Sequence, residues 1–276
     1  MTIAQLLAAM VSFQIGASIA KSLFPLVGPI GMVTVRVGLG TLILIITLRP
    51  WRTRLVLSTW RPMLIYGVSL GLMNTFFYLA LSRIPQGVAV AVEFIGPLAV
   101  AVLTSQRLGD FLWIVLAAVS LILLLPVSHV GVRTDLFGML LALAAAGCWA
   151  LYIIYGQKVG NTYGAQATAL GSVISASFIV PLGFVARGTV LLSREVLVPG
   201  FLVALLSTAL PYTLEMIALT RMSARTFGIL MSVEPALGAV MGYGYLGERL
   251  TVTQWVAIVL IIVASVGSTY RSRLPT

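Results

Sequence analysis

The stretch PIGMVTVRVGLGTLILIITL, residues 29–48, is twenty residues long and carries a single charge, at Arg36. About twenty predominantly apolar residues are what an α-helix needs to cross the hydrocarbon core of a bilayer. The whole chain has the same character, because 60% of its 276 residues are hydrophobic and only 9% are charged. A soluble domain of this size carries about 25% charged residues. The chain cannot cover a water-facing surface, so we expect an all-α integral membrane protein.

Ten apolar stretches of this kind follow one another along the chain. Windows of about 19 residues predict transmembrane helices at 3–22, 29–48, 62–81, 86–104, 110–126, 135–155, 164–186, 196–219, 226–246 and 252–270. The connections are too short to hold a separate soluble domain. The first stretch lacks a basic region before it and a cleavage site after it, so we interpret it as a retained helix and not as a signal peptide.

The distribution of Lys and Arg over the connections predicts the orientation of the chain. Ten basic residues fall on one side of the predicted helices: Arg49, Arg52, Arg54, Arg61, Arg107, Lys158, Arg221, Arg225, Arg271 and Arg273. Six fall on the other side: Lys21, Arg83, Arg133, Arg187, Arg194 and Arg249. Because basic loops remain in the cytoplasm, we expect both termini to be cytoplasmic. These residues are scattered singly, so the net charge of +10 does not indicate nucleic-acid binding.

The sequence matches itself when it is shifted by 138 residues, half its length. Apolar composition alone would not align Arg, Pro and Gly in one register, as in the pairs Arg83/Arg221, Pro97/Pro235 and Gly109/Gly247. We therefore predict two five-helix repeats, 1–134 and 135–276. Because five is an odd number, the second repeat is inverted relative to the first. Such inverted repeats are common in secondary transporters, whose sites lie at the repeat interface near the middle of the membrane.

Three acids, Glu93, Glu215 and Glu234, fall inside predicted helices. A charge at the bilayer centre costs about 2.5–3.5 kcal/mol, so such residues face a cavity or a partner. Glu93 precedes Pro97 by four residues and Glu234 directly precedes Pro235. Proline cannot donate to the carbonyl four residues earlier, so each acid meets a weakened backbone. This pattern predicts a proton or cation site with hinges at the two prolines; the alternative is a kinked helix whose glutamate serves packing.

Glu215 is predicted nearer the cytoplasmic end of its helix. At that depth, Glu215 could form a structural ion pair or extend its side chain toward the membrane surface, and the sequence favours these roles no more than a role in binding substrate. Arg36 is predicted about 10 Å below the outer surface, at 1.5 Å per residue. Glu93 has a similar predicted depth, so we expect the two to pair. Lys21, at the outer end of the first helix, either extends toward the surface or attracts an anionic group.

Other polar and aromatic residues inside the predicted helices are candidates to line a site. They can supply hydrogen bonds or aromatic walls: Gln14, Asn74, Tyr78, Trp149, Tyr152 and Tyr212. For each aromatic residue, a place at the membrane interface or in packing remains the alternative.

Several features argue against enzymatic chemistry and against a cofactor. The single histidine, His129, falls in a predicted outer loop, and Cys148 is the single cysteine, so neither residue type offers a transition-metal cluster. The sequence contains no phosphate-binding GxxxxGK[ST] motif, so the chain is not its own ATPase. We therefore expect no cofactor, and an enzyme is the weakest class.

The sequence resembles the drug/metabolite transporter superfamily, in its ten-helix branch with two EamA-type halves, and within it the bacterial threonine and homoserine exporters. The likeness runs over nearly the whole chain. It is carried by GASIAKSLFP (16–25), VRVGLG (35–40), VEFIGPL (92–98), GCWALY (147–152), STALPYTLEMIALTR (207–221), RTFGILMSVEPAL (225–237) and LGERLT (246–251). One departure is Gln14-Ile15-Gly16, where many members carry Trp-Gly.

The resemblance implies export of small amino acids across the bacterial inner membrane, driven by the proton gradient. The partners would then be the amino acid, protons and the lipid bilayer. Two alternatives stay open: export of other metabolites or cationic drugs on the same fold, and a non-transporting scaffold or channel. A zwitterion needs an acceptor for its ammonium group, which Glu93 or Glu234 could supply. It also needs a donor for its carboxylate, from among Arg36, Lys21, Asn74 or a tyrosine.

Overall fold

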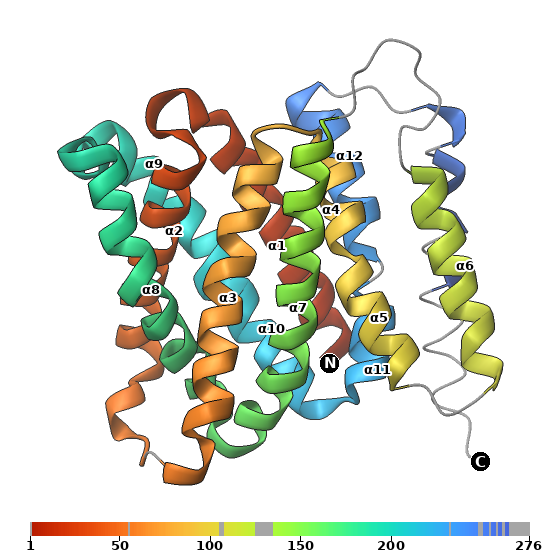
Figure 1. The fold of residues 1–276 in the computed structure, drawn as a ribbon, viewed down its shortest axis with the longest axis horizontal. Coiled ribbons are helices and arrows are strands. Elements are labelled where there is room, and N and C mark those ends of the chain that lie inside the picture. Colours follow the sequence, from red (N-terminus) through yellow and green to blue (C-terminus); the bar gives the residue numbers. More distant parts are fainter. Residues whose placement is uncertain are drawn as a thin grey trace.

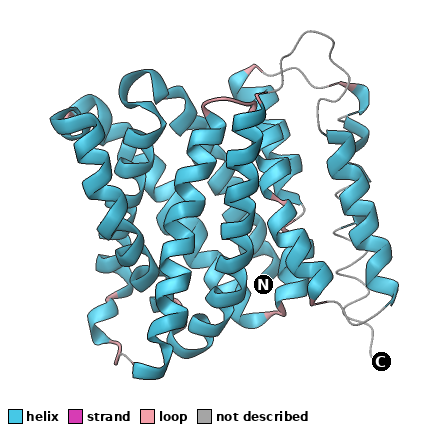
Figure 2. Cartoon of the chain, in the orientation of Figure 1, coloured by secondary structure: helices cyan, strands magenta, loops and turns pink. Residues whose placement is uncertain are grey.

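The computed structural model describes residues 2–264 apart from 55, 105–107, 125–134, 232, 248–250, 254, 258 and 261–262. Among these residues the regular elements are helices, which stand side by side as a bundle (Figures 1 and 2). Seven helical stretches are long and apolar enough to cross a membrane. The α-helices are α1 (Thr2–Ser22), α2 (Phe24–Leu48), α3 (Trp60–Leu81), α4 (Gln86–Glu93), α5 (Ile95–Leu103), α6 (Leu108–Leu124), α7 (Leu136–Tyr163), α8 (Gln166–Arg187), α9 (Arg194–Ala204), α10 (Leu210–Arg221), α11 (Ala224–Leu230) and α12 (Val233–Leu246).

These helices confirm an all-α membrane protein of about ten helices, with most boundaries close to the prediction. The second span begins where Pro29 follows Gly28, whose φ of +68° lies in the left-handed region that glycine adopts without strain. The sixth span, α7, continues to Tyr163, past the predicted end at residue 155. Most of the predicted tenth span, 252–270, lies outside the described residues.

Two spans are interrupted, the fourth and the ninth. The fourth span breaks between α4 and α5, three residues before Pro97, and the ninth breaks between α11 and α12, just before Pro235. The predicted interruptions are therefore present, and a proline without an N–H is the local cause of each. The eighth span is helical from Arg194 to Arg221, but a π-helical segment, Leu205–Ala209, joins α9 to α10. Pro211 follows it and leaves the carbonyl of Ser207 without its helical donor.

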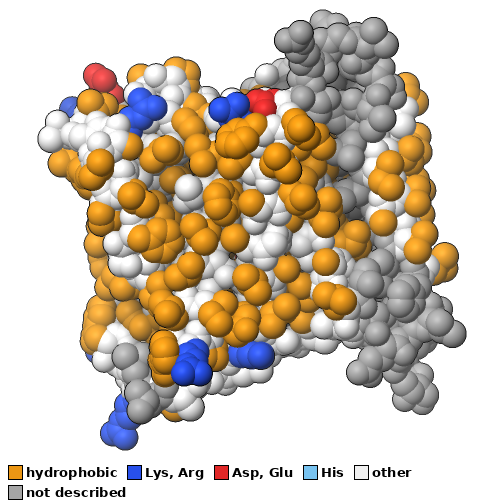
Figure 3. Space-filling view, viewed as in Figure 1, with side chains coloured by type: hydrophobic (Ala, Val, Ile, Leu, Met, Phe, Trp, Pro, Cys, Tyr) orange, Lys and Arg blue, Asp and Glu red, His pale blue; other side chains and the backbone are white. Residues whose placement is uncertain are grey.

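Burial is arranged for a lipid solvent. Arg36, Glu93 and Glu234 lie in the interior, with 0%, 6% and 3% of their surface exposed, whereas large apolar side chains such as Val185 and Leu103 point outward. Figure 3 shows an apolar band across the face in view, with Lys and Arg side chains at its upper and lower edges and acidic side chains at its upper edge. This band can face hydrocarbon, because the backbone polar groups are satisfied within helices.

Helices from the two halves of the chain pack in matched pairs. α3 packs along α7 and α1 along α10, while α4 packs against α12 and α5 against α11. A shift of 138 residues turns each pair into its mate. A two-fold relation between the halves generates this reciprocal packing. Its consequence for the site is that the two interrupted spans, the fourth and the ninth, lie against each other.

The start of the second half is tied to the connection after α3. Asp135 accepts a hydrogen bond from the backbone N–H of Gly138 (3.0 Å), which caps α7, and it pairs with Arg83 at 3.0 Å. The Gly138 N–H and the Arg83 guanidinium together hold the pKa of Asp135 below its ordinary value. The cap and ion pair are therefore fully present at neutral pH and are lost as the pH falls through this lowered pKa.

Close packing of α5 on α7 generates a stability prediction. A Cβ added at Gly96 would collide with the backbone carbonyl oxygen of Ala146, which cannot move aside easily. We expect Gly96→Ala to lower the free energy of unfolding by about 1–3 kcal/mol, the usual cost of overpacking. The measurement is thermal unfolding of the purified protein in detergent. The matched control is Gly147→Ala on α7, where a Cβ would meet nothing within 4 Å; equal melting temperatures for the two variants would contradict the predicted contact.

Candidate functional site

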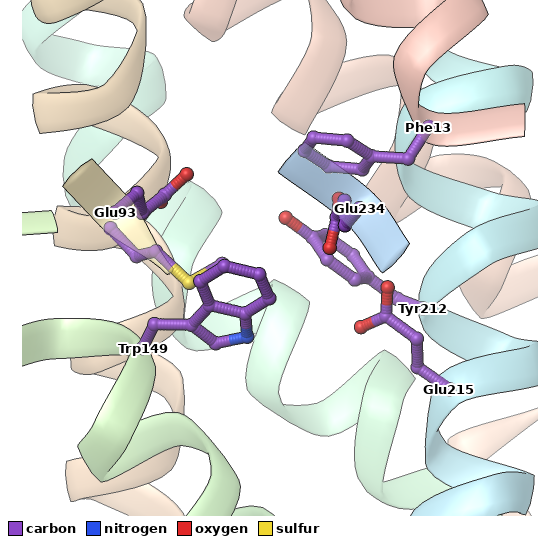
Figure 4. Close-up of a pocket in the computed structure, with 7 residues that line it drawn as sticks. Phe13, Glu93, Trp149, Tyr212, Glu215 and Glu234 are labelled. Atoms are coloured by element: carbon purple, nitrogen blue, oxygen red, sulfur yellow. The ribbon is translucent and has the colours of Figure 1, made fainter. Parts of the chain in front are cut away.

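The three intramembrane acids meet at one small cavity inside the bundle. Glu93 ends α4, Glu215 lies on α10 and Glu234 lies in the first turn of α12. The cavity is small, and its wall is completed by Phe13, Met73, Trp149 and Tyr212 (Figure 4). The sequence left Glu215 open between the membrane surface and the site. The structure buries it beside the other two acids, with 4% of its surface exposed.

One carboxylate oxygen of Glu234 accepts a hydrogen bond, and the other has no partner among the described residues. The side-chain Nε2 of Gln14 donates to Oε1 of Glu234 at 3.2 Å. Oε2 of Glu234 is buried and has no hydrogen-bond partner among the described residues. Its position in the first turn of a helix is electrostatically favourable for a carboxylate, because the unpaired N–H groups there carry partial positive charge. Figure 4 shows the carboxyl group between the rings of Phe13 and Tyr212.

Glu215 is held by an aromatic partner. The hydroxyl of Tyr152 donates to Oε2 of Glu215 at 3.2 Å. The Tyr152 ring in turn stacks on Tyr66, with ring centroids 5.2 Å apart. Gln14 and Tyr152 occupy the same position in the two halves of the chain, since 152 − 14 = 138. Each of these mates therefore holds one of the buried acids.

Glu93 faces the cavity from the opposite wall. Figure 4 shows Glu93 and Trp149 on one side, across from Glu215, Tyr212 and Glu234. No hydrogen bond joins the Glu93 side chain to another described residue, and the same holds for the indole N–H of Trp149. Both groups are therefore open to whatever occupies the cavity.

The predicted ion pair between Arg36 and Glu93 is wrong. Nε of Arg36 donates to Oγ1 of Thr208 at 2.9 Å, and Nη2 donates to the carbonyl oxygen of Ser207. Among the described residues, no acid lies within ion-pairing distance of Arg36. The physical reason is Pro211, which frees the Ser207 carbonyl for an outside donor. Predicted depth alone paired Arg36 with an acid and took no account of this freed acceptor.

Arg36 lies behind an aromatic wall. Its guanidinium carbon is 4.9 Å from the centroid of Phe13, 5.1 Å from that of Tyr78 and 5.7 Å from that of Tyr212. Phe13 and Tyr212 also line the cavity, so these two rings stand between the cation and the cavity space. Such cation–π contacts help to hold a desolvated guanidinium.

Tyr212 is the link between Arg36 and Asn74. Its hydroxyl accepts from Nη2 of Arg36 at 3.0 Å and donates to Oδ1 of Asn74 at 2.9 Å. Nδ2 of Asn74 donates to the carbonyl of Leu70 at 2.7 Å, which fixes the orientation of its amide. Asn74 and Arg36 thus position the Tyr212 ring, and neither belongs to the cavity lining itself.

Some predicted residues are not brought to the cavity, and some lining residues were missed. Lys21 lies at the end of α1 with Nζ 3.5 Å from the carbonyl of Ile84, outside the lining. Phe13 and Met73 were missed because no sequence signal separates them from other apolar helix residues. Gln86, the first residue of the predicted span 86–104, was not among the predicted site residues, yet it is fully buried.

The cavity holds an excess of acidic groups. Among the described residues, the buried charged side chains are Arg36 and the three glutamates, so the acids outnumber the cation by 3 − 1 = 2. No group of His, Cys, Asp or Glu in the described part of the chain has the arrangement of a metal site. Uncompensated buried charge costs several kcal/mol per ion. The site therefore favours protons or a positively charged group of a solute.

Known proteins resemble the chain over its full length. Residues 136–270 match the EamA-like transporter family. The threonine/homoserine exporter RhtA of Escherichia coli (strain K12) is 53% identical over 268 residues, which cover 97% of this chain and 91% of that protein. RhtA of Salmonella typhimurium (strain LT2) matches to the same extent. The uncharacterized transporter YvbV of Bacillus subtilis (strain 168) is 30% identical over 167 residues, covering 56% of this chain and 54% of that protein.

A solved crystal structure shows the same fold. It superposes with a TM-score of 0.78 and covers 99% of this chain and 97% of that chain, with 16% sequence identity.

The hydrogen bonds of Arg36 generate a second stability prediction. Arg36→Lys retains the charge but cannot make the forked donations to Thr208, Ser207 and Tyr212. We expect the free energy of unfolding to fall by about 1–3 kcal/mol, the cost of leaving a buried polar group unpaired. Thermal unfolding in detergent measures the loss, with Arg52→Lys, at an exposed arginine, as the matched control. A change no larger than that of the control would show that the fork does not stabilise the π-helical segment.

Proposed function

The chain belongs to the EamA-like transporter family, and on this premise we propose that it exports small zwitterionic amino acids, threonine and homoserine among them, in exchange for protons. It is a multi-pass protein of the bacterial inner membrane, and its family consists of transporters and not of enzymes. The exporters that match 97% of the chain at 53% identity support the choice of substrate. The proposal that protons drive export rests on the site itself.

The meeting of three carboxyl groups at one cavity is the observation that carries the proposal. Glu93, Glu215 and Glu234 line this space, whereas the guanidinium of Arg36 lies outside the lining and is bonded to neutral acceptors through Nε and Nη2. A proton and the ammonium group of an amino acid can both neutralise such a carboxylate. Because the two compete for one group, each is released on the side of the membrane where the other is abundant. Antiport then requires no further machinery.

The geometry of the cavity supports a small zwitterion. The unpartnered Oε2 of Glu234 is the proposed acceptor for the ammonium group. The indole N–H of Trp149, which can only donate, is the proposed partner of the carboxylate. Arg36 and Asn74 act indirectly, because both are bonded to Tyr212.

Alternating access is proposed to use the two proline breaks. The fourth and ninth spans lie against each other and carry Glu93 and Glu234 beside Pro97 and Pro235. A change of angle at these breaks would open the cavity to one side and close it to the other. The reciprocal helix packing supports two inverted repeats, 1–134 and 135–276, and the distribution of basic residues supports cytoplasmic termini.

Counterflow in proteoliposomes tests the substrate. Vesicles loaded with unlabelled threonine should accumulate labelled threonine and homoserine transiently, because the carrier exchanges them faster than the gradient decays. The panel should include other labelled amino acids and one cationic dye. Exchange of the dye without exchange of threonine would reject the amino-acid proposal and favour a cationic-drug exporter on the same fold.

Neutral variants of the acids test the coupling. Glu234→Gln or Glu93→Gln should abolish proton-driven accumulation of threonine, because an amide cannot carry the transported proton. Downhill exchange should survive in part, since the amide oxygen can still accept a hydrogen bond from an ammonium group. Substrate-induced proton flux in liposomes is the measurement. The exposed acid Glu195 provides the matched control as Glu195→Gln; unchanged proton stoichiometry in both cavity variants would leave Glu215 as the coupling residue.

A further inference from the structure

Buried polar side chains form a file that runs from Glu234 along α1 to the start of α4. Gln14, Ser18 and Gln86 have none of their surface exposed. Gln14 donates to Glu234, Gln86 lies behind Gln14, and Ser18 lies behind Gln86. The file ties together three helices, α1, α4 and α12, that are distant in sequence. Gln86 does not line the cavity, and in this series of hydrogen bonds Gln14 lies between Gln86 and Glu234.

Gln86 holds both oxygens of Gln14. Its Nε2 lies 2.9 Å from Oε1 of Gln14 and 3.4 Å from the backbone carbonyl oxygen of the same residue. An amide nitrogen carries two N–H donors, so one nitrogen can serve both oxygens. The backbone carbonyl oxygen of Gln14 can only accept, so it places the amide nitrogen of Gln86 on the side of Gln14. The hydroxyl of Ser18 lies 2.9 Å from the same carbonyl oxygen and 3.1 Å from Oε1 of Gln86, so it can donate to either oxygen.

The hydrogen bonds from Gln86 determine which end of the Gln14 amide faces Glu234. With Oε1 of Gln14 committed to Gln86, its Nε2 must point toward the acid, where it donates to Oε1 of Glu234 at 3.2 Å. A flipped Gln14 would set two N–H groups against each other at Gln86 and two oxygens against each other at Glu234. In a buried site both contacts are unfavourable, because neither pair can turn to water.

We propose that Gln86 is a positioning residue for Glu234, acting through the orientation of the Gln14 amide. The donation from Gln14 occupies Oε1 of Glu234 and holds the carboxyl group, while Oε2 stays without a hydrogen-bond partner among the described residues. The effect of Gln86 on substrate binding rests on the proposed function, in which Oε2 of Glu234 accepts the ammonium group of the amino acid.

A double-mutant cycle in the full-length protein tests whether Gln86 acts through Gln14. Gln14→Leu and Gln86→Leu should each raise the KM for labelled L-threonine severalfold in proteoliposomes, with a smaller effect on the maximal rate. The KM of the double variant should be no higher than that of Gln14→Leu alone, because Gln86 has no Gln14 amide left to orient once Gln14 is replaced. Multiplying effects would overturn the proposal, since they would mean that Gln86 supports packing independently.

Infrared spectroscopy provides a readout that needs no substrate. The carboxyl band of Glu234 is identified as the band that Glu234→Gln removes. It should shift in the same direction in Gln14→Leu and Gln86→Leu, and by less in Ser18→Ala, a milder change that tests the file if Gln86→Leu fails to fold. The matched control is Gln157→Leu, which removes an amide that donates to the carbonyl of Met222 at 3.1 Å away from the cavity.

The two readouts separate the positioning role from the proposed function. Threonine transport with an unmoved Glu234 band in Gln86→Leu and Ser18→Ala overturns the positioning role and leaves the proposed function standing. A shifted band in a protein that carries no threonine supports the positioning role and rejects the proposed substrate.

Discussion

The structure depends on one constraint: a polar group inside the hydrocarbon must find its partner within the protein. This constraint makes every long element a helix and turns the apolar side chains outward. It also gathers polar side chains in the interior, where Arg36, Gln14, Glu215 and Glu234 form hydrogen bonds with side chains from distant helices. The interior is therefore a connected polar network inside an apolar shell.

Prolines determine where this network can form. A proline without an N–H frees a carbonyl in the middle of a helix, and that carbonyl needs another donor. Pro211 frees the carbonyl of Ser207, and Arg36 supplies the donor from α2. Pro97 and Pro235 break the fourth and ninth spans beside Glu93 and Glu234. The missing N–H of a proline thus allows the Arg36–Ser207 hydrogen bond at one place and interrupts a helix near a buried acid at two others.

The network divides its charges between structure and function. Arg36, the buried cation in the described part of the chain, is bonded to neutral acceptors through Nε and Nη2 and is covered by aromatic rings, so it can hold the π-helical segment and Tyr212 in place. The acids have fewer partners: Glu215 has Tyr152, Glu234 has Gln14, and Glu93 has no hydrogen bond to another described residue. A site whose cation is engaged and whose acids are open can take up positive charge. That property suits the proposed exchange of protons for amino acids in a family of transporters.

The sequence by itself determined the class of protein, nearly all the described spans, the breaks in the fourth and ninth spans and the identity of the buried acids. These follow from local properties: the hydrophobicity of a twenty-residue window, the missing N–H of a proline, and the cost of a charge in lipid. Only the tertiary structure decided that Arg36 binds Thr208 and Ser207 instead of Glu93, that Glu215 joins the cavity, and that Gln86 grips Gln14. These contacts depend on how helices far apart in sequence are rotated against one another, which the residue pattern of a single helix does not contain.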